Sequence, residues 1–166
     1  MILITGGQRS GKSSFAQSYC ETHFTDYTYL ATCLPLDTEL DLRVKKHQQD
    51  RSEKWKLIEE GYQISDIHFS EGVTLIDCIT LWLTNLFMKY NEDIDMCLSY
   101  AKNEILQIQQ THKSIVWVTN EIGLGVIPIH ASTRKFCDLQ GWVNQFVATQ
   151  CSEVYFMVSG IPTKIK

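Results

Sequence analysis

The amino-acid sequence predicts an α/β fold in which a mainly parallel central sheet lies between two helical layers, a three-layer sandwich. Two observations support this prediction. Short continuous apolar runs at residues 1–5, 73–78 and 114–120 have the composition of strands that are buried on both faces. These runs alternate with longer segments whose apolar residues recur at helical intervals. That alternation is typical of parallel strands joined by crossover helices.

In the first half of the chain, strands and helices alternate from the first residue. The apolar run 1–5 predicts a buried strand, and residues 13–24 follow it with apolar residues at helical spacing. Residues 27–33 are rich in β-formers and predict a second strand. Residues 37–51 again have helical periodicity, and residues 55–59 predict a short strand.

The second half follows the same two patterns. Residues 93–112 carry apolar residues three or four apart, which is the period of an amphipathic helix. Ser132 is expected to be the N-cap of a helix that continues to about residue 150. The other elements are predicted from short apolar or helical runs, with strands at 73–78, 114–120 and 153–159 and a helix at 79–90.

Length and composition indicate one soluble globular domain, residues 1–166. The chain has 166 residues, an apolar fraction of 44% and a charged fraction of 20%. Its net charge is −4 and its pI is about 5.7. This acidic balance argues against a general binder of nucleic acid or of anionic membranes, so we expect neither partner.

The cysteine pattern points to a reducing compartment. The six cysteines form no Cys-x-x-Cys pair, and none has zinc-ligand spacing with a histidine. We therefore expect reduced, mostly buried thiols. Because the chain begins directly with the predicted strand 1–5 and has no charged n-region before it, we expect no signal peptide. Because no long apolar run follows, we expect no membrane insertion and a cytoplasmic protein.

A phosphate-binding loop follows the first strand. It has the pattern Gly-x-x-x-x-Gly-Lys-Ser, in which small residues let backbone N–H groups surround phosphate oxygens, and the next helix adds its free N-terminal N–H groups. The lysine provides a charge for the β- and γ-phosphates, and the serine hydroxyl is a ligand for Mg²⁺. The residues are Gly6, Gly7, Gln8, Arg9, Ser10, Gly11, Lys12 and Ser13. The strand before and the helix after this motif predict a P-loop NTPase-type fold.

A second carboxylate on the magnesium side is expected at the end of another strand. Asp77, within the run 73–78, fits this role, although an aspartate there is also a common N-cap for a following helix. Glu121, after the strand at 114–120, is the competing candidate for binding metal or substrate. No Asn-Lys-x-Asp or Thr-Lys-x-Asp motif is present, which argues against a switch GTPase. The size and the single P-loop favour a small-molecule kinase or nucleotidyl transferase.

Four stretches together resemble one family. They are GGQRSGKS near the start, RVKKHQQDRSEKW at 43–55, IDCITLWLTNL at 76–86 and VTNEIGLGVIP at 118–128, followed by DLQGWVNQ at 138–145 and VSGIPTKIK at the end. The chain resembles the bifunctional adenosylcobinamide kinase / adenosylcobinamide-phosphate guanylyltransferase family of cobalamin biosynthesis. The resemblance covers nearly the whole chain.

The resemblance implies two reactions with ATP and GTP as substrates and Mg²⁺ as cofactor. A nucleoside triphosphate phosphorylates the corrinoid substrate adenosylcobinamide, and GTP then guanylylates an enzyme histidine, from which GMP passes to give adenosylcobinamide-GDP. The histidine of the family's Arg-x-x-x-His segment corresponds to His47, four residues after Arg43. A neutral imidazole is a competent nucleophile near pH 7, although a lone histidine on a helix is more often a solvated surface residue. The family also implies a homo-oligomer, a homotrimer.

The resemblance places further residues at the nucleotide. They are Ala31, Thr32, Cys33, Gln48, Gln49, Asp50, Arg51, Glu59 and Asp77. Many relatives have serine where this chain has Cys33, so we expect a backbone contact there. Glu59 could accept from the guanine edge or be a surface carboxylate. Trp55 could stack on a base or be a core aromatic, and the loop 120–125 could hold the corrinoid or simply turn.

Two other functions stay open on the sequence alone. One is a P-loop kinase for a different small alcohol, without guanylyl transfer. The other is a nucleotide-binding module without catalysis. A covalent GMP adduct would exclude both. The remaining histidines, His23, His68, His112 and His130, lack a catalytic context and are expected to be structural or exposed.

Overall fold

One sheet contains every strand that the structure describes. The structure is a computed structural model that describes residues 1–34, 54–69, 71–112 and 114–166. The strand order is β3-β2-β4-β5-β1-β6-β7, and all neighbours are parallel except the antiparallel pair β6 and β7. The strands are β1 (Ile2–Gly6), β2 (Tyr27–Ala31), β3 (Trp55–Glu59), β4 (Val73–Asp77), β5 (Ile115–Val118), β6 (Glu153–Val158) and β7 (Ile161–Lys164).

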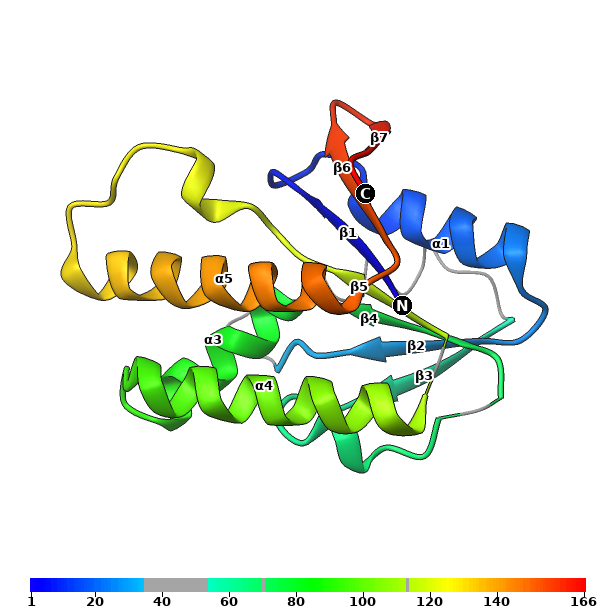
Figure 1. Ribbon diagram of the computed structural model, residues 1–166, viewed down its shortest axis with the longest axis horizontal. Helices are drawn as coiled ribbons and strands as arrows, with labels where there is room; N and C mark the ends of the chain where they lie inside the picture. Colours follow the sequence, from blue (N-terminus) through cyan, green and yellow to red (C-terminus); the bar gives the residue numbers. More distant parts are fainter. Residues whose placement is uncertain (35–53, 70, 113) are drawn as a thin grey trace.

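Helices cover both faces of this sheet, so the predicted α/β sandwich is confirmed (Figure 1). One face is covered by α1, and the other by α3, α4 and α5, of which α4 and α5 lie side by side. The helices are α1 (Lys12–His23), α3 (Ile79–Lys89), α4 (Ile94–Thr111) and α5 (Ala131–Gln150), with single 3₁₀ turns η1 (Ile64–Asp66) and η2 (Ile122–Leu124).

Two hydrophobic clusters hold the layers together. The larger cluster lies between the sheet and α3, α4 and α5 and includes Trp82, Trp117 and Ile105, all fully buried. The smaller cluster lies between the sheet and α1 and includes Ile4, Ala16 and Leu75. Each large apolar side chain buried in this way contributes about 1.5–3 kcal/mol to the hydrophobic stabilisation.

Local signals explain most element boundaries. Asp93 caps α4, because its side chain accepts a hydrogen bond of 3.0 Å from the backbone N–H of Met96. The prediction that Ser132 caps the last helix is wrong. The N-cap of α5 is His130, and the hydroxyl of Ser132 instead donates to Glu92 at 2.7 Å. The predicted helix at 37–51 lies outside the described residues.

The last strand, β7, was not predicted from the sequence. The final strand was expected at 153–159, whereas the chain turns at Ser159 and Gly160 and returns as β7. Gly160 has a φ of 84°, a left-handed conformation that favours glycine. β6 pairs with β1, and the N–H of Gly160 donates to the carbonyl of Ser10 at 3.0 Å, so the turn between β6 and β7 lies against the predicted phosphate loop.

Candidate functional site

The predicted phosphate loop joins the end of β1 to the start of α1, as its motif requires. Gly6, Arg9 and Gly11 have φ angles of 153°, 56° and 91°, so three residues of the loop have a positive φ, and Gly11 immediately precedes α1. The backbone N–H of Ser10 donates to the carbonyl of Gly7 at 3.3 Å and closes the turn. The loop therefore presents backbone N–H groups and a helix N-terminus at the carboxyl edge of the sheet, where an anion is stabilised.

The turn between β6 and β7 supports this loop from behind. The N–H of Gly160 donates to the carbonyl of Ser10 at 3.0 Å. A Cβ added to Gly11 would lie 3.1 Å from the Cα of Gly160, and one added to Gly6 would lie 2.6 Å from the carbonyl oxygen of Met157. A side chain at either glycine of the motif would thus crowd backbone atoms of the segment 157–160, whether or not a ligand is bound.

Lys12 occupies a buried position at the start of α1. Its side chain is 7% exposed, and Nζ donates to the carbonyl oxygen of Gly7 at 2.6 Å. Burial lowers the pKa of Lys12, while the nearby carboxylate of Asp77 acts in the opposite direction. The ammonium group therefore lies under the loop, beside a carboxylate and close to the place where phosphate oxygens would bind.

Asp77 ends β4 on the same face of the sheet as α1. Its Oδ2 accepts a hydrogen bond of 2.8 Å from the hydroxyl of Tyr29, which orients the carboxylate. Asp77 does not cap the following helix, because the N-cap of α3 is Cys78 and no side chain bonds there. Parallel pairing sets Asp77 and Glu59 on either side of Ala31, so these three residues form one row at the edge of the sheet.

Glu121 lies on the opposite face of the sheet from Asp77. Its backbone N–H donates to the carbonyl of Gly6 at 3.1 Å, and its Oε1 accepts from the hydroxyl of Thr5 at 2.6 Å. The same oxygen accepts from Asn144 of α5 at 3.1 Å. The two candidate carboxylates are therefore held by different helical layers, and Asp77 is the one that acts on the charge of Lys12.

Residues 31–33 run from the last residue of β2 into the following loop, and the side chain of Thr32 already has partners. Its hydroxyl donates to the carbonyl of Cys78 at 2.8 Å and accepts from the N–H of Cys78 at 2.9 Å. Asn85 of α3, which is 3% exposed, donates to the carbonyls of Thr32 and Gly61 at 2.7 and 3.0 Å. Asn85 thus holds the backbone after β2 in place from a buried position in α3. An amide side chain within the mainly apolar helix 79–89 is the sequence signal that could have identified it.

Other predicted site residues have different surroundings. Trp55 is a core aromatic: it is buried against Tyr27 and Tyr29, and its Nε1 donates to Glu21 at 2.8 Å. Gln8, Arg9 and Glu59 are exposed, and Ser13 is partly buried. The remaining predicted residues, His47, Gln48, Gln49, Asp50 and Arg51, lie outside the described residues.

Histidines and cysteines behave as expected in the described part of the chain. His23 stacks on Tyr19, His112 packs edge-on against Phe69, and His68 and His130 are exposed. All six cysteines are described and none forms a disulfide. Burial raises the pKa of Cys20 and of Cys78 to about 12, so both thiols stay protonated near pH 7.

The loop after Glu121 is unusually apolar for its exposure. Its large apolar side chains are between 69% and 94% exposed, and they are Leu124, Val126, Ile127 and Ile129. In Figure 1 this loop extends away from the end of β5 before it returns to the start of α5. Contiguous exposed apolar side chains of this kind mark contact surfaces.

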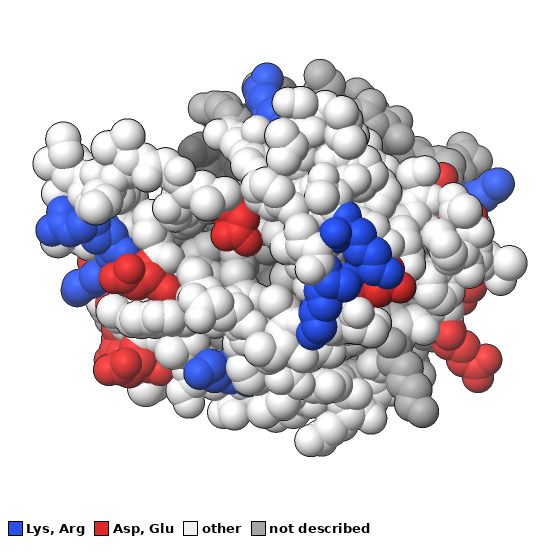
Figure 2. Space-filling model, turned by 45° about the horizontal axis from the view of Figure 1, so that its top comes forward, with Lys and Arg blue, Asp and Glu red and all other residues white. Residues whose placement is uncertain are grey.

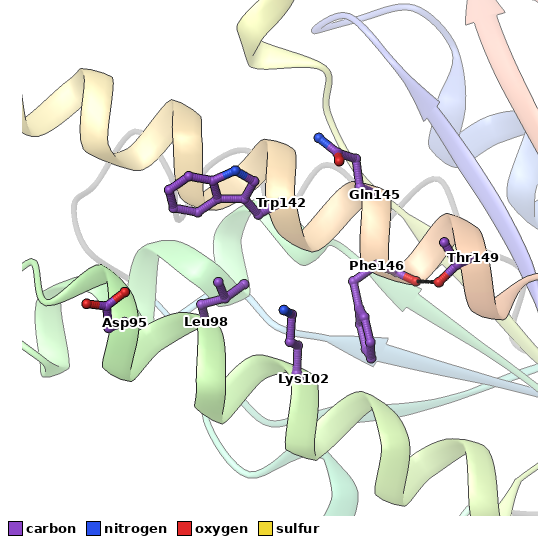
Figure 3. A pocket seen from close by; sticks show the side chains of 7 residues that line it. All are labelled: Asp95, Leu98, Lys102, Trp142, Gln145, Phe146 and Thr149. Atoms are coloured by element: carbon purple, nitrogen blue, oxygen red, sulfur yellow. Dashed lines mark hydrogen bonds between the residues drawn. The ribbon is translucent and has the colours of Figure 1, made fainter.

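A separate hollow of about 480 Å³ lies between α4 and α5 (Figure 3). Trp142 and Phe146 of α5 face Leu98 and Lys102 of α4 across it. The ammonium of Lys102 lies 5.5 Å from the centre of the Phe146 ring. Since all lining residues belong to these two helices, the hollow is not part of the phosphate-loop site.

One face of the molecule carries both basic and acidic side chains (Figure 2). On the face drawn in Figure 2, small groups of basic side chains alternate with acidic and uncharged ones. Among the residues that the structure describes, no helix is both long and apolar enough to cross a membrane.

Comparison with known proteins gives consistent matches over the full chain. The family model CobU, described as cobinamide kinase / cobinamide phosphate guanyltransferase, matches residues 2–165. The bifunctional adenosylcobalamin biosynthesis protein CobU of Escherichia coli (strain K12) is 37% identical, with 100% of this chain and 99% of that protein covered. The bifunctional adenosylcobalamin biosynthesis protein CobP of Pseudomonas aeruginosa is 34% identical, with 99% and 96% covered. The CobU protein of Salmonella typhimurium is 33% identical, with 100% and 99% covered.

Proposed function

Because the chain belongs to the cobinamide kinase / cobinamide phosphate guanyltransferase family, we propose that it catalyses both reactions of adenosylcobinamide activation. It phosphorylates adenosylcobinamide with a nucleoside triphosphate, and it transfers GMP from GTP to the resulting phosphate to form adenosylcobinamide-GDP. The observation that carries this proposal is the intact phosphate loop, with Lys12 and Asp77 on one face of the sheet, in a chain that matches the family from end to end.

The phosphate loop, residues 6–13, binds the nucleotide phosphates, with Lys12 facing the β- and γ-phosphates. The segment 31–33 and the carboxylates of Glu59 and Asp77 line the rest of the nucleotide site. Their positions in one row at the carboxyl edge of β2, β3 and β4 support this assignment. Ligands bind at this edge in open parallel sheets.

Mg²⁺ is held by Ser13 and Asp77 together with phosphate oxygens. A hydroxyl and a carboxylate are hard oxygen donors, which suits Mg²⁺. Among the described residues, no cluster of three or more acidic, histidine or cysteine side chains forms a cage for a metal ion. The two protein donors are therefore sufficient only for an ion that also binds nucleotide and water, as Mg²⁺ does. When bound, the ion neutralises charge on the transferred phosphoryl group.

His47 is the nucleophile of the guanylyl step. The imidazole attacks the α-phosphorus of GTP and pyrophosphate leaves, so the enzyme holds GMP through a phosphoramidate bond. The phosphate of the corrinoid then takes GMP from the histidine. Residues 48–51 contact the same nucleotide. These assignments rest on the family resemblance of the segment around Arg43.

Residues 1–166 form a single catalytic domain that assembles into a homotrimer in the cytoplasm. One continuous sheet supports the single domain. The exposed apolar side chains of the loop 124–129 and of Ile161 and Ile165 support an assembly that covers them. Light scattering at several concentrations tests the trimer, and a monomer at all of them would refute it.

A two-part assay tests the function. The purified protein is incubated with Mg²⁺, ATP or GTP, and adenosylcobinamide, and the corrinoid products are separated and weighed by mass spectrometry. We expect adenosylcobinamide phosphate with either or both nucleotides, and adenosylcobinamide-GDP when GTP is present. If adenosylcobinamide phosphate forms without any adenosylcobinamide-GDP, the protein is a kinase without guanylyl transfer. Absence of both products would refute the proposal.

A further inference from the structure

We propose that Glu121 accepts the proton of the substrate hydroxyl in the kinase step, and that Asn144 positions Glu121 for this role. The inference deepens the proposed function and rests on it. It assigns the acceptor side of the site to residues that the phosphate loop and the nucleotide contacts do not include.

The location of Glu121 fits a group that meets the phosphoryl acceptor. β5 lies between β4 and β1 in the sheet, so the chain that leaves β5 emerges between Asp77 and the phosphate loop. Asp77 and Lys12 lie on the α1 face, whereas Glu121 is held from the α5 face. An acceptor that approaches from the α5 side therefore meets Glu121 across the site from Lys12 and Asp77.

The carboxylate of Glu121 is fixed through one oxygen alone. Oε1 accepts hydrogen bonds from the hydroxyl of Thr5 at 2.6 Å and from Nδ2 of Asn144 at 3.1 Å. The other oxygen, Oε2, accepts no hydrogen bond from any residue that the structure describes, and Glu121 is partly exposed. The side chain is thus oriented by one oxygen and has a second that can bind a ligand.

A buried network sets the orientation of Asn144. Oδ1 of Asn144 accepts from the hydroxyl of Thr119 at 2.8 Å and from Nε2 of Gln140 at 2.9 Å. Two donors on this oxygen turn Nδ2 toward Glu121 and the carbonyl of Asn120, which accepts at 3.0 Å. Thr119, Gln140 and Asn144 are 0%, 1% and 5% exposed.

Burying three polar side chains is costly unless each is hydrogen-bonded, and the bonds among them restrict Asn144 to one arrangement. A contact that only joined α5 to the sheet could be apolar, like the neighbouring contacts of Leu139 and Val143. The polar network instead ends on a carboxylate at the edge of the sheet. This arrangement fits the preorganisation of a catalytic group by packed neighbours.

The chemistry is balanced. The oxygen of the substrate hydroxyl forms a bond to the γ-phosphorus, and the bond between the γ-phosphorus and the β–γ bridging oxygen breaks, so the nucleoside diphosphate leaves. The hydroxyl proton passes to Oε2 of Glu121 and later to water. Covalent uptake of GMP has no hydroxyl acceptor: the unprotonated ring nitrogen of the neutral His47 imidazole attacks the α-phosphorus, so no hydroxyl proton has to be removed. Glu121 is therefore needed for the kinase step and dispensable for covalent uptake of GMP.

The test compares both steps in the full-length protein. We expect Glu121→Gln to lower kcat of adenosylcobinamide phosphorylation by at least about 100-fold, as for loss of a general base, with little change in the KM for nucleotide. Covalent uptake of GMP from GTP should stay within about threefold of the parent. The matched control is Glu104→Gln. The buried carboxylate of Glu104 accepts a hydrogen bond from the backbone N–H of Ser65, outside the proposed site. Replacing this carboxylate with an amide should leave both rates unchanged.

Asn144→Ala tests positioning. In the parent background this change should lower kcat for phosphorylation about 10-fold or more, and in the Glu121→Gln background it should have no further effect. Independent, multiplying effects would show that Asn144 does not act through Glu121 and would overturn the positioning role.

The outcomes separate this inference from the proposed function. A parent protein without either activity refutes the function itself. A parent with both activities and a folded Glu121→Gln variant that keeps more than a third of the kinase rate refutes the inference alone. If Glu121→Gln slows both steps equally, the inference is also overturned, because that result is expected when the carboxylate binds magnesium or supports the structure.

Discussion

Replacing Lys12 with methionine should separate nucleotide binding from stability. The side chain is buried, and its ammonium makes one hydrogen bond of 2.6 Å to the carbonyl of Gly7. Gly7 is exposed, so water can replace the ammonium at that carbonyl. Burial already disfavours the charge, as the lowered pKa indicates. Methionine keeps the stem and removes the charge, so we expect the free energy of unfolding to change by less than about 1 kcal/mol.

Nucleotide affinity should fall sharply in the same variant. A charge-assisted hydrogen bond is worth about 1.5–3 kcal/mol, and each 1.4 kcal/mol is a factor of ten in the dissociation constant. Lys12→Met should therefore weaken binding of GTP with Mg²⁺ by about 10- to 150-fold. Isothermal titration calorimetry measures the affinity, and denaturant unfolding measures the stability.

The matched control is Lys56→Met. Lys56 is exposed on β3 and pairs with Asp26 at 3.2 Å, so its loss should change GTP affinity by less than about twofold. If a folded Lys12→Met protein bound GTP within about threefold of the parent, the phosphate-loop assignment would be refuted.

Three more predictions address the rest of the site. Asp77→Asn should lower the rate of both steps by about 100-fold and raise the magnesium concentration that turnover requires, as measured by magnesium titration of turnover. If only Glu121→Gln behaves in this way, Glu121 and not Asp77 is the carboxylate that binds magnesium. Asn85→Leu should destabilise the fold by about 2–4 kcal/mol in denaturant unfolding, since it leaves two buried carbonyls unpaired, and a loss below 1 kcal/mol would contradict this. At about pH 8.5, GTP should slow alkylation of the partly exposed Cys33 but not of Cys137, as followed by peptide mass spectrometry. Cys78, whose pKa burial raises to about 12, should stay unmodified, and its rapid alkylation would contradict the buried position.

Sequence patterns predicted the strand–helix alternation because each element has one dominant signal. The strands at 55–59 and 73–78 are apolar or rich in β-formers and lie almost where predicted. The position of the phosphate-loop motif could be predicted because the motif is local: its residues run without interruption from Gly6, the last residue of β1, to Ser13 in the first turn of α1. Such features depend on neighbours in sequence and need no knowledge of the fold.

Features that depend on distant pairing were missed. β7 is a short, fully exposed strand, so it lacks the apolar signal of the others, although its Ser-Gly turn is a recognisable hairpin signal. The partners of the site carboxylates were also missed. Tyr29 is 48 residues from Asp77, and Asn144 is 23 residues from Glu121, so only the folded chain brings them together.

The central claim is that this chain carries GMP on its own histidine between two reactions. The most direct measurement is the intact mass of the protein after incubation with GTP and Mg²⁺, for the parent and for His47→Asn. We expect the parent to gain one GMP, which acid removes and alkali does not, and adenosylcobinamide phosphate to discharge it as adenosylcobinamide-GDP. His47→Asn should gain nothing while it still phosphorylates adenosylcobinamide. A parent that never gains GMP, or a folded His47→Asn protein that does, would contradict the account.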